Sequence, residues 1–338
     1  MSGGVDSSLA AALLLQQGHE VEGVTMKLSA GVCCDIASAQ AVCSHLGIPH
    51  RIIDLQLEFE RTVVKNFISE YRAGRTPNPC IRCNDIMKFR VLLAHAREKG
   101  FDFLATGHYA RVQHNPSLAR FLLKTGIDSE KDQSYFLYRL TQDQLAHVLF
   151  PLGGMRKREV REQARLLALP AAERPESQEI CFVPDDDYRA FLAEHAPDVL
   201  RQGEIVLTDG TIMGKHKGIA FYTVGQRRKL GVAAGERLYV RKIEPETSRV
   251  VLGKGSDPQR QELTSDQANF ISLKALLSPL AVTVKIRYRS PFEPAVIEPL
   301  GPNRVQVRFR RPIAGISPGQ AAVFYNEDIV VGGGIIES

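Results

Sequence analysis

The stretch SGGVDSSLAAALLLQ at residues 2–16 decides the fold class, because it joins a glycine–serine turn directly to an apolar helical segment. Glycine adopts positive φ without strain and leaves its amide accessible, so Gly3 and Gly4 suit a tight loop. A loop of backbone amides at the start of a helix binds phosphate groups. The stretch therefore predicts a phosphate site at residues 2–8, in front of a helix that contains Leu9.

This loop differs from the phosphate loop G-x-x-x-x-G-K-[ST], because no lysine follows its glycines. In that other loop the lysine reaches the β- and γ-phosphates. Here the carboxylate of Asp6 is expected to help hold a magnesium ion on the phosphates. The competing interpretation is an ordinary glycine turn capped by Ser7.

The bulk composition is that of a globular protein with two or three domains. The chain has 338 residues, of which 44% are hydrophobic and 24% charged, and it contains no apolar run of membrane-spanning length. Its six cysteines are irregularly spaced. This pattern favours reduced thiols in the cytoplasm over a disulfide framework, so we expect a cytoplasmic protein without a membrane partner.

The positive charge is unevenly distributed. The formal net charge is +5, and residues 201–261 hold 12 Lys and Arg against 6 Asp and Glu. Such a basic segment suits a polyanionic partner, although a solvated basic face is an equally good interpretation of the charge alone.

Helices and strands alternate along residues 1–110. The pattern predicts strands near 20–28, 48–55 and 101–106, and helices near 35–45, 57–72 and 84–99. Strands spaced by helices form a parallel sheet, which binds ligands beyond the carboxyl ends of its strands. Residues 135–197 are expected to be mainly helical. From Arg201 onward the chain changes to short strands, with clean alternation at 282–288 and 304–310, which predicts a β-rich half in two small domains.

The cysteines leave several functions open. Cys80 and Cys83 precede the predicted helix at 84–99, near Arg82 and Lys88, so their thiolates are expected to be favoured. Cys181 lies far along the chain. A zinc site, an iron–sulfur site and a nucleophile all suit this spacing. For Cys33 and Cys34, packing as small hydrophobic side chains is the default interpretation, with a metal or sulfur-handling role as the alternative, and the sequence assigns no role to Cys43.

The motifs of the chain also carry a family resemblance. The opening loop resembles the PP-loop of ATP pyrophosphatases, which split ATP between its α and β phosphates. Further motifs continue the likeness along essentially the whole chain: GRTPNP at 74–79, CN at 83–84, KF at 88–89, ATGHYAR at 105–111, KDQSYFL at 131–137, FPLG at 150–153, YTVGQR at 222–227 and SPGQ at 317–320. With these motifs the chain resembles the tRNA-specific 2-thiouridylases.

The resemblance implies a tRNA-uridine 2-sulfurtransferase, which uses ATP and Mg²⁺ to adenylate the C2 oxygen of the wobble uracil before sulfur attacks C2. The base would leave its stack to be reached. The implied partners are tRNA and a sulfur donor, such as a cysteine desulfurase or a sulfur relay protein.

The resemblance also implies site residues. Cys83 would be the nucleophile and Cys181 the persulfide carrier. ATP would bind Ser2, Gly3, Gly4, Val5, Asp6, Ser7, Ser8, Met26 and Gly107, and the base would lie against Asn78, Pro79 and Cys80. Contacts with tRNA would come from His108, Lys131, Asp132, Gln133, Arg287, Tyr288 and Gln320. From the residues alone, Met26 would be a core side chain, Lys131 and Asp132 a solvated pair, and Arg287 a surface charge.

Many relatives carry Asp where this chain has Cys80. The additional thiol suggests that Cys80, Cys83 and Cys181 hold a [4Fe–4S] cluster with one open iron, as an alternative to the persulfide relay.

The fold expected from these patterns has three parts. A PP-loop α/β domain with a parallel sheet at 1–198 is followed by a small basic β domain at 199–261 and a β-barrel at 262–338, both expected to bind tRNA. In the family a short apolar strand precedes the PP-loop. We therefore expect the gene product to begin roughly ten residues before Met1.

Two other functions compete with this interpretation. An amide-forming PP-loop synthetase would adenylate a small metabolite and be active without tRNA. A non-catalytic tRNA-binding protein would retain the loop without turnover.

Overall fold

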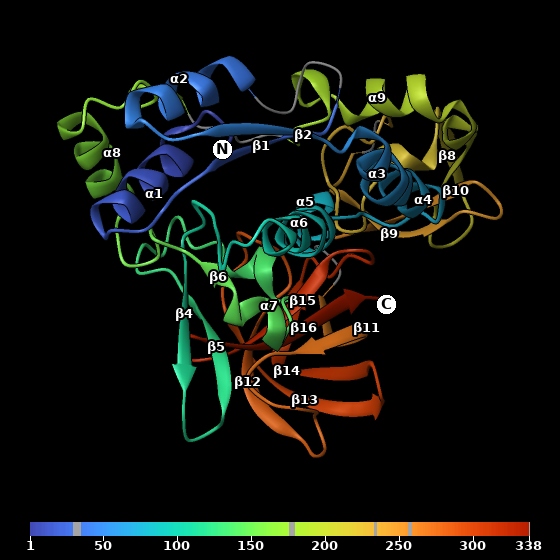
Figure 1. Ribbon diagram of the computed structural model, residues 1–338. Helices are drawn as coiled ribbons and strands as arrows, with labels where there is room; N and C mark the ends of the chain where they lie inside the picture. The colour runs from blue at the N-terminus through green and yellow to red at the C-terminus, as the bar shows by residue number, and fades with distance from the viewer. Residues whose placement is uncertain (30–34, 176–179, 233–234, 256–258, 338) are drawn as a thin grey trace. The chain divides into compact units, whose positions relative to one another are not determined.

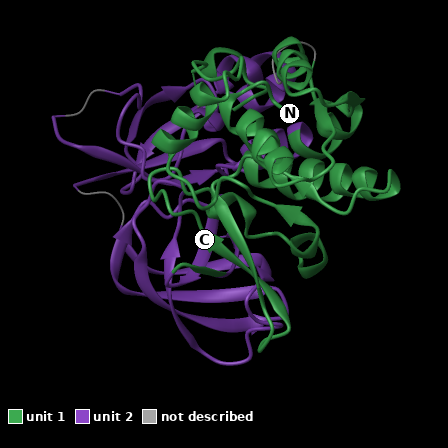
Figure 2. Cartoon of the chain, turned by 60° about the vertical axis from the view of Figure 1, so that its left-hand side comes forward, with its two compact units in different colours: residues 1–63, 80–186, 328–330 green, residues 64–79, 187–327, 331–338 purple. Residues whose placement is uncertain are grey.

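The computed structural model describes residues 1–29, 35–175, 180–232, 235–255 and 259–337. The chain divides into two compact units that interleave along the sequence (Figure 2). Unit 1 comprises residues 1–63, 80–186 and 328–330, and unit 2 comprises residues 64–79, 187–327 and 331–338. None of the described helices is long and apolar enough to cross a membrane.

Unit 1 begins with the predicted loop and helix. Helix α1 (Val5–Gln16) is followed by β1 (Gly23–Lys27), α2 (Ile36–Leu46) and β2 (His50–Asp54). The side chain of Asp35 caps α2 by accepting from Ser38 N, and Gly47 ends it with a φ of 67°. Strands β1 and β2 pair in parallel, with Met26 opposite Ile53. The sequence-based assignment of this region as alternating helix and strand is confirmed.

A long helical segment carries two of the cysteines. Helix α5 (Pro79–Cys83) runs through a wide, π-type segment at Asn84–Leu92 into α6 (Leu93–Glu98). A similar helical segment precedes it and consists of α3 (Gln56–Phe59), a π-type turn at Glu60–Val64 and α4 (Lys65–Arg72). Helix α4 belongs to unit 2. The helices predicted at 57–72 and 84–99 are thus confirmed, the second starting earlier than expected.

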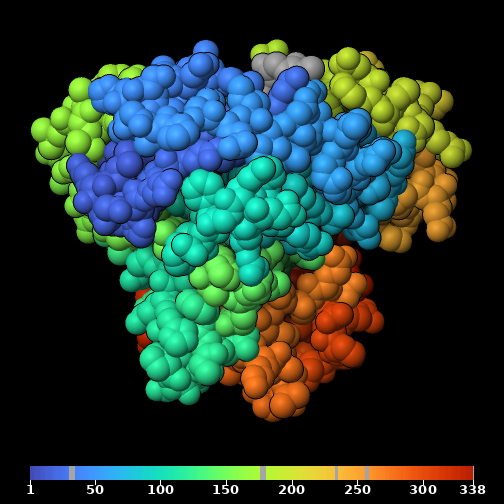
Figure 3. All heavy atoms as spheres, viewed as in Figure 1, coloured from blue at the N-terminus to red at the C-terminus, as the bar shows by residue number. Residues whose placement is uncertain are grey.

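The rest of unit 1 contains a second parallel pair and a hairpin. Strand β3 (Leu104–Ala105) pairs in parallel with β6 (Val148–Leu149), and within the described residues this pair is separate from β1 and β2. Strands β4 (Ala110–Asn115) and β5 (Arg120–Thr125) form an antiparallel hairpin whose tip lies at the surface (Figure 3). This hairpin was not predicted from the sequence. Helices α7 (Gln142–Ala146) and α8 (Lys157–Leu166) follow, and α8 packs beside α1 through Leu9 and Val160 (Figure 1).

Unit 2 is mostly β-structure after α9 (Tyr188–His195). Strands β7 (Gly203–Leu207), β8 (Ile212–His216), β9 (Leu238–Glu244) and β10 (Arg249–Lys254) form a sheet in the order β8-β7-β10-β9. Only the β7–β10 pair is parallel among these described pairings. Its core includes Ile205, Val240 and Val250, which are fully buried.

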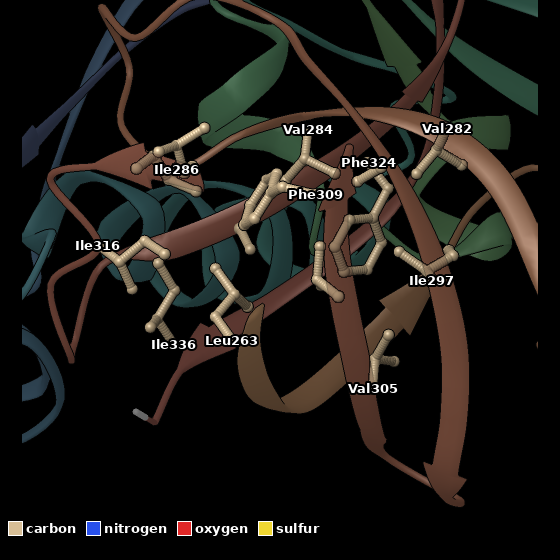
Figure 4. Close-up of a cluster of buried hydrophobic side chains, with 14 of the residues drawn as sticks. Leu263, Val282, Val284, Ile286, Ile297, Val305, Phe309, Ile316, Phe324 and Ile336 are labelled. Carbon is tan, nitrogen blue, oxygen red and sulfur yellow. The ribbon is translucent and has the colours of Figure 1, made fainter. Parts of the chain in front are cut away.

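The C-terminal strands close into a barrel. They are β11 (Gln259–Phe270), β12 (Leu280–Lys285), β13 (Glu293–Gly301), β14 (Arg304–Ala314), β15 (Ala321–Asn326) and β16 (Ile329–Ile336). Their order is β11-β14-β13-β12-β15-β16, and β11 pairs with β16 to complete the circle. Closure leaves no free edge among these strands. Alternate apolar residues such as Val284, Phe309 and Phe324 fill the interior (Figure 4), which confirms the alternation read from the sequence.

Candidate active site

The loop at residues 2–8 curls at the start of α1. Gly3 has a φ of +79°, in the left-handed region that favours glycine. Ser2 N donates to Ser7 Oγ at 3.2 Å, and the hydroxyl groups of Ser7 and Ser8 donate to Gly4 O at 3.1 and 2.9 Å. Gly4 occupies the N-cap position and its residue type supplies no side-chain cap. The first-turn amides of α1 are thus left for an anion, as a phosphate site requires.

Asp6, in the first turn of α1, is bound by two side chains whose contact with it was not predicted from the sequence. Lys157 Nζ lies 2.6 Å from Asp6 Oδ1 and 2.8 Å from Oδ2. The hydroxyl of Tyr109 donates to Oδ1 at 2.7 Å, and the Lys157 ammonium also lies 5.6 Å from the centre of the Tyr109 ring. Lys157 is buried, at 8% exposure. A cation therefore stands beside the loop although the loop contains no lysine.

A second cation contacts the other side of the loop. Arg174 Nη1 donates to Gly3 O at 3.2 Å, and its Nη2 donates to Asp35 Oδ2 at 2.7 Å. Two hydrogen bonds from Ser38, together with a smaller effect of Arg174, lower the pKa of Asp35 to about 2. No local pattern in the sequence identifies Arg174 or Lys157, because each approaches the loop from a distant part of the chain.

Gly107 packs directly against the first turn of α1. A Cβ atom at this position would lie 2.8 Å from the carbonyl carbon of Asp6 and 2.9 Å from Ser7 N. The turn after β3 and the loop in front of α1 are therefore in contact. Met26, the other predicted adenosine contact, lies half-buried in β1.

Cys80 and Cys83 lie three residues apart in α5, on one face of the helix. Cys80 and Cys181 are near enough for their charges to interact, and both are exposed. Phe182, next to Cys181, is buried against Phe59 with ring centres 5.5 Å apart. Unit 1 therefore contains both cysteines of α5 and Cys181, with Cys80 near Cys181.

The predicted preference for a Cys80 thiolate is wrong. Desolvation by surrounding protein atoms, with a smaller contribution from Cys181, raises the pKa of the Cys80 thiol to about 11, against a weaker opposing effect of Lys88. Solvent still touches one side of this exposed residue, which moderates the shift. The reason for the error is desolvation, which outweighs the favourable position of Cys80 in the first turn of α5.

The remaining cysteines are not part of this group. Cys43 is buried in a small cluster with Ala11 and Ile48, where desolvation raises the pKa of its thiol, in agreement with a packing role. Cys33 and Cys34 lie outside the described residues. Among the residues that the structure describes, no group of three or more His, Cys, Asp or Glu side chains is arranged to hold a metal ion.

His108 is buried between two aromatic rings. Its ring centre lies 5.9 Å from that of Phe89 and 5.8 Å from that of Phe150, and Nδ1 shares a 2.7 Å hydrogen bond with Thr106 Oγ1. Burial, and then the charge of Lys88, lowers the pKa of His108 well below its usual value. The side chain is 7% exposed, and its contact with tRNA remains a prediction.

Two side chains of the segment Lys131–Gln133 accept hydrogen bonds from nearby backbone N–H groups. Asp132 is buried, and its carboxylate accepts from Gly126 N at 3.0 Å and from Ser134 N at 3.1 Å. Gln133 Oε1 accepts from Tyr109 N at 3.0 Å. Interpreting Asp132 as a solvated loop residue is therefore wrong, whereas the tRNA contacts of the segment remain predictions.

The other residues predicted to bind the base or tRNA belong to unit 2 and are Asn78, Pro79, Arg287, Tyr288 and Gln320. Arg287 Nη2 donates to Ser317 Oγ at 2.8 Å, and the Tyr288 ring lies 5.7 Å from Lys285 Nζ. Gln320 Nε2 donates to Thr76 O at 2.8 Å. Asn78 is half-buried and Pro79 buried, directly before the exposed Cys80.

Comparison with known proteins finds three family models that match this chain. Residues 1–185 match a family described as tRNA methyl transferase HUP domain, residues 189–254 a tRNA methyl transferase PRC-barrel domain, and residues 260–336 an aminomethyltransferase beta-barrel domain. The three matches cover most of the chain.

Individual relatives are similar over the full length. A protein of Caldanaerobacter subterraneus named tRNA-specific 2-thiouridylase MnmA 1 is 48% identical over 100% of this chain and 96% of its own length. Proteins named tRNA-specific 2-thiouridylase MnmA from Acetivibrio thermocellus and Halothermothrix orenii are 47% and 46% identical over 100% of this chain and 98% and 97% of theirs.

Proposed function

Because the chain belongs to the tRNA-specific 2-thiouridylase MnmA family, we propose that it is a tRNA-uridine 2-sulfurtransferase, which thiolates the wobble uridine at C2 at the expense of ATP. The single observation that carries this proposal is the arrangement of unit 1. There the anion-binding loop at α1, the glycine turn at Gly107 and the cysteines of α5 and Cys181 belong to one compact body.

The loop at residues 2–8 accounts for the ATP half of the reaction. The first-turn amides of α1 and the cations Lys157 and Arg174 would hold the phosphates. The uracil C2 oxygen attacks the α-phosphorus and pyrophosphate leaves, so C2 then bears AMP as a leaving group. Magnesium would arrive with ATP. Asp6 Oδ2 suits it better than Oδ1, because Oδ1 accepts bonds from both Tyr109 and Lys157, whereas Oδ2 accepts a bond from Lys157.

The cysteines account for the sulfur half. A persulfide on Cys181 attacks C2 through its terminal sulfur, and AMP leaves with the C2 oxygen. Cys83 then attacks Cys181 Sγ, which releases the 2-thiouridine and leaves a Cys83–Cys181 disulfide. An external thiol reductant restores both cysteines, and a sulfur donor such as a cysteine desulfurase or relay protein renews the persulfide. Exposure of Cys181 suits this exchange.

The iron–sulfur alternative fits the described arrangement less well. Cys80, Cys83 and Cys181 have suitable ligand chemistry, but among the described residues they do not form a metal-holding group. The persulfide route is therefore the proposed source of the sulfur. The raised pKa of Cys80 agrees with a thiol that stays protonated beside the reaction.

Substrate binding and domain organisation complete the proposal. Asn78, Pro79 and Cys80 would line the uracil, with Met26 and Gly107 at the adenosine. Arg287, Tyr288 and the basic segment at 201–261 would meet tRNA. The family matches at 1–185, 189–254 and 260–336 support a division into a catalytic domain at 1–198, a central domain at 199–261 and a barrel at 262–338.

The deciding experiment is an assay of anaerobically purified protein for ATP-dependent thiolation of tRNA, with iron and zinc measured in the same sample. We expect thiolated tRNA, AMP and pyrophosphate in equal amounts, in iron-free protein as well. Cys83→Ala should abolish thiolation, while Cys43→Ala, in the packed cluster, should retain it. AMP formation without tRNA would favour the amide-forming synthetase. Binding of tRNA without thiolation would favour the non-catalytic protein.

A further inference from the structure

The turn Ser317–Gln320, between β14 and β15, is fixed to the barrel. Gly319 N donates to Ile336 O at 2.9 Å, and Ile336 N donates to Gln320 O at 2.8 Å. Ser317 is buried, and its hydroxyl donates to Val224 O at 3.2 Å while it accepts from Arg287. The turn is therefore a rigid part of unit 2.

This turn holds the segment that leads into α5. Thr76 N donates to Pro318 O at 2.8 Å. In return, Gln320 Nε2 donates to Thr76 O at 2.8 Å and to Pro77 O at 3.4 Å. The segment Thr76–Pro79 contains two prolines, which lack N–H groups and cannot join a regular ladder. Its carbonyl groups need donors from elsewhere, and Gln320 supplies them.

Two neighbouring residues show how closely the turn and the segment approach. A Cβ atom on Gly319 would lie 2.9 Å from Thr76 N and 3.0 Å from Arg75 Cβ, and Gly319 has a φ of +89°. The Thr76 hydroxyl also donates to Thr223 Oγ1 at 3.1 Å. Three of the sequence motifs, at 74–79, 222–227 and 317–320, therefore meet at Thr76.

We propose that Gln320 is a positioning residue, which acts through Thr76 and Pro77 on the uracil-binding residues. It fixes Asn78 and Pro79, and with them the entry into α5, which carries Cys80 and Cys83. The inference rests on the proposed function, because it concerns the same uracil site. The tRNA contact that the family resemblance implied for Gln320 stays a prediction, because the two bonds use only the side-chain Nε2.

The test separates affinity for tRNA from the rate of the bound complex. Gln320→Leu keeps the side-chain bulk and removes the donor, which leaves two carbonyl groups without their bond. We expect the single-turnover thiolation rate at saturating tRNA and ATP to fall about tenfold or more, whatever the change in the tRNA dissociation constant. Gln306→Leu is the matched control, because Gln306 donates to Glu262 on the same barrel and should change neither quantity.

A milder variant guards against misfolding. Thr223→Val keeps the shape of the side chain and removes only the partner of the Thr76 hydroxyl, so the rate should fall about threefold with unchanged tRNA affinity. Thermal unfolding establishes that each variant is folded. A tRNA dissociation constant that rises about tenfold while the saturated rate stays constant would overturn the proposal in favour of direct contact, and so would two variants with unchanged rates. If the unchanged protein fails to thiolate tRNA, the proposed function fails instead.

Discussion

The ammonium group of Lys157 lies 2.6 and 2.8 Å from the two carboxylate oxygens of Asp6, although the residues are 151 positions apart. This pair cancels the negative charge of the PP-loop next to the expected triphosphate. The Tyr109 hydroxyl fixes the same carboxylate from another direction. The structure therefore places a compensated carboxylate, rather than a free negative charge, at the start of α1.

Removal of Lys157 should weaken ATP binding. Lys157→Met leaves the Asp6 charge uncompensated beside the phosphates, so we expect the ATP dissociation constant to rise about tenfold or more, measured by calorimetry without tRNA. Lys157→Arg should restore much of the affinity. Arg158→Met is the control, because Arg158 lies exposed on the same helix. An unchanged affinity in Lys157→Met would show that the ammonium serves only to stabilise the fold.

Gly107→Ala should disrupt the loop by overpacking. The added methyl group would lie under 3.0 Å from Asp6 and Ser7 backbone atoms, which cannot move aside without shifting the first turn of α1. We expect a loss of stability of about 1–3 kcal/mol and weaker ATP binding. Gly154→Ala is the matched control, since its Cβ would meet nothing within 4 Å. Equal unfolding temperatures and ATP affinities for both variants would contradict the overpacking at Gly107.

The cysteines should fall into two classes. In the persulfide route Cys83→Ser and Cys181→Ser reduce thiolation to background, whereas Cys80→Ser keeps most of the rate, because the Cys80 thiol is protonated at neutral pH. Single-turnover assays with persulfide-loaded protein measure this directly. Equal losses in all three variants, together with stoichiometric iron in the unchanged protein, would instead support the cluster.

Local patterns predicted much of the fold. Glycine and serine at residues 2–8 specify the loop, and alternation in β12 and β14 specifies the barrel faces, because both depend on neighbours in sequence. The β4–β5 hairpin was missed since it interrupts the helix–strand alternation. The partners of Asp6 and Thr76 were also missed. Lys157 and Gln320 lie 151 and 244 residues away, and only tertiary packing brings them into contact.

The buried His108 should make stability depend on pH. Its pKa in the folded protein lies well below 6.5, whereas an exposed histidine in the unfolded chain titrates near that value. Below about pH 6.5 the unfolded chain therefore binds a proton that the folded protein does not, and stability falls with a slope of up to about 1.4 kcal/mol per pH unit.

The test compares the unchanged protein with His108→Asn, whose amide can replace the bond to Thr106. The variant loses ring packing against Phe89 and Phe150, so it should be less stable at pH 8. The difference in unfolding free energy should shrink between pH 7 and about pH 5, because only the unchanged protein then loses stability through His108. His50 and His216, whose pKa values burial also lowers, are common to both proteins and cancel in the difference. A difference that stays constant with pH in urea titrations would mean that the folded protein accepts a proton at His108.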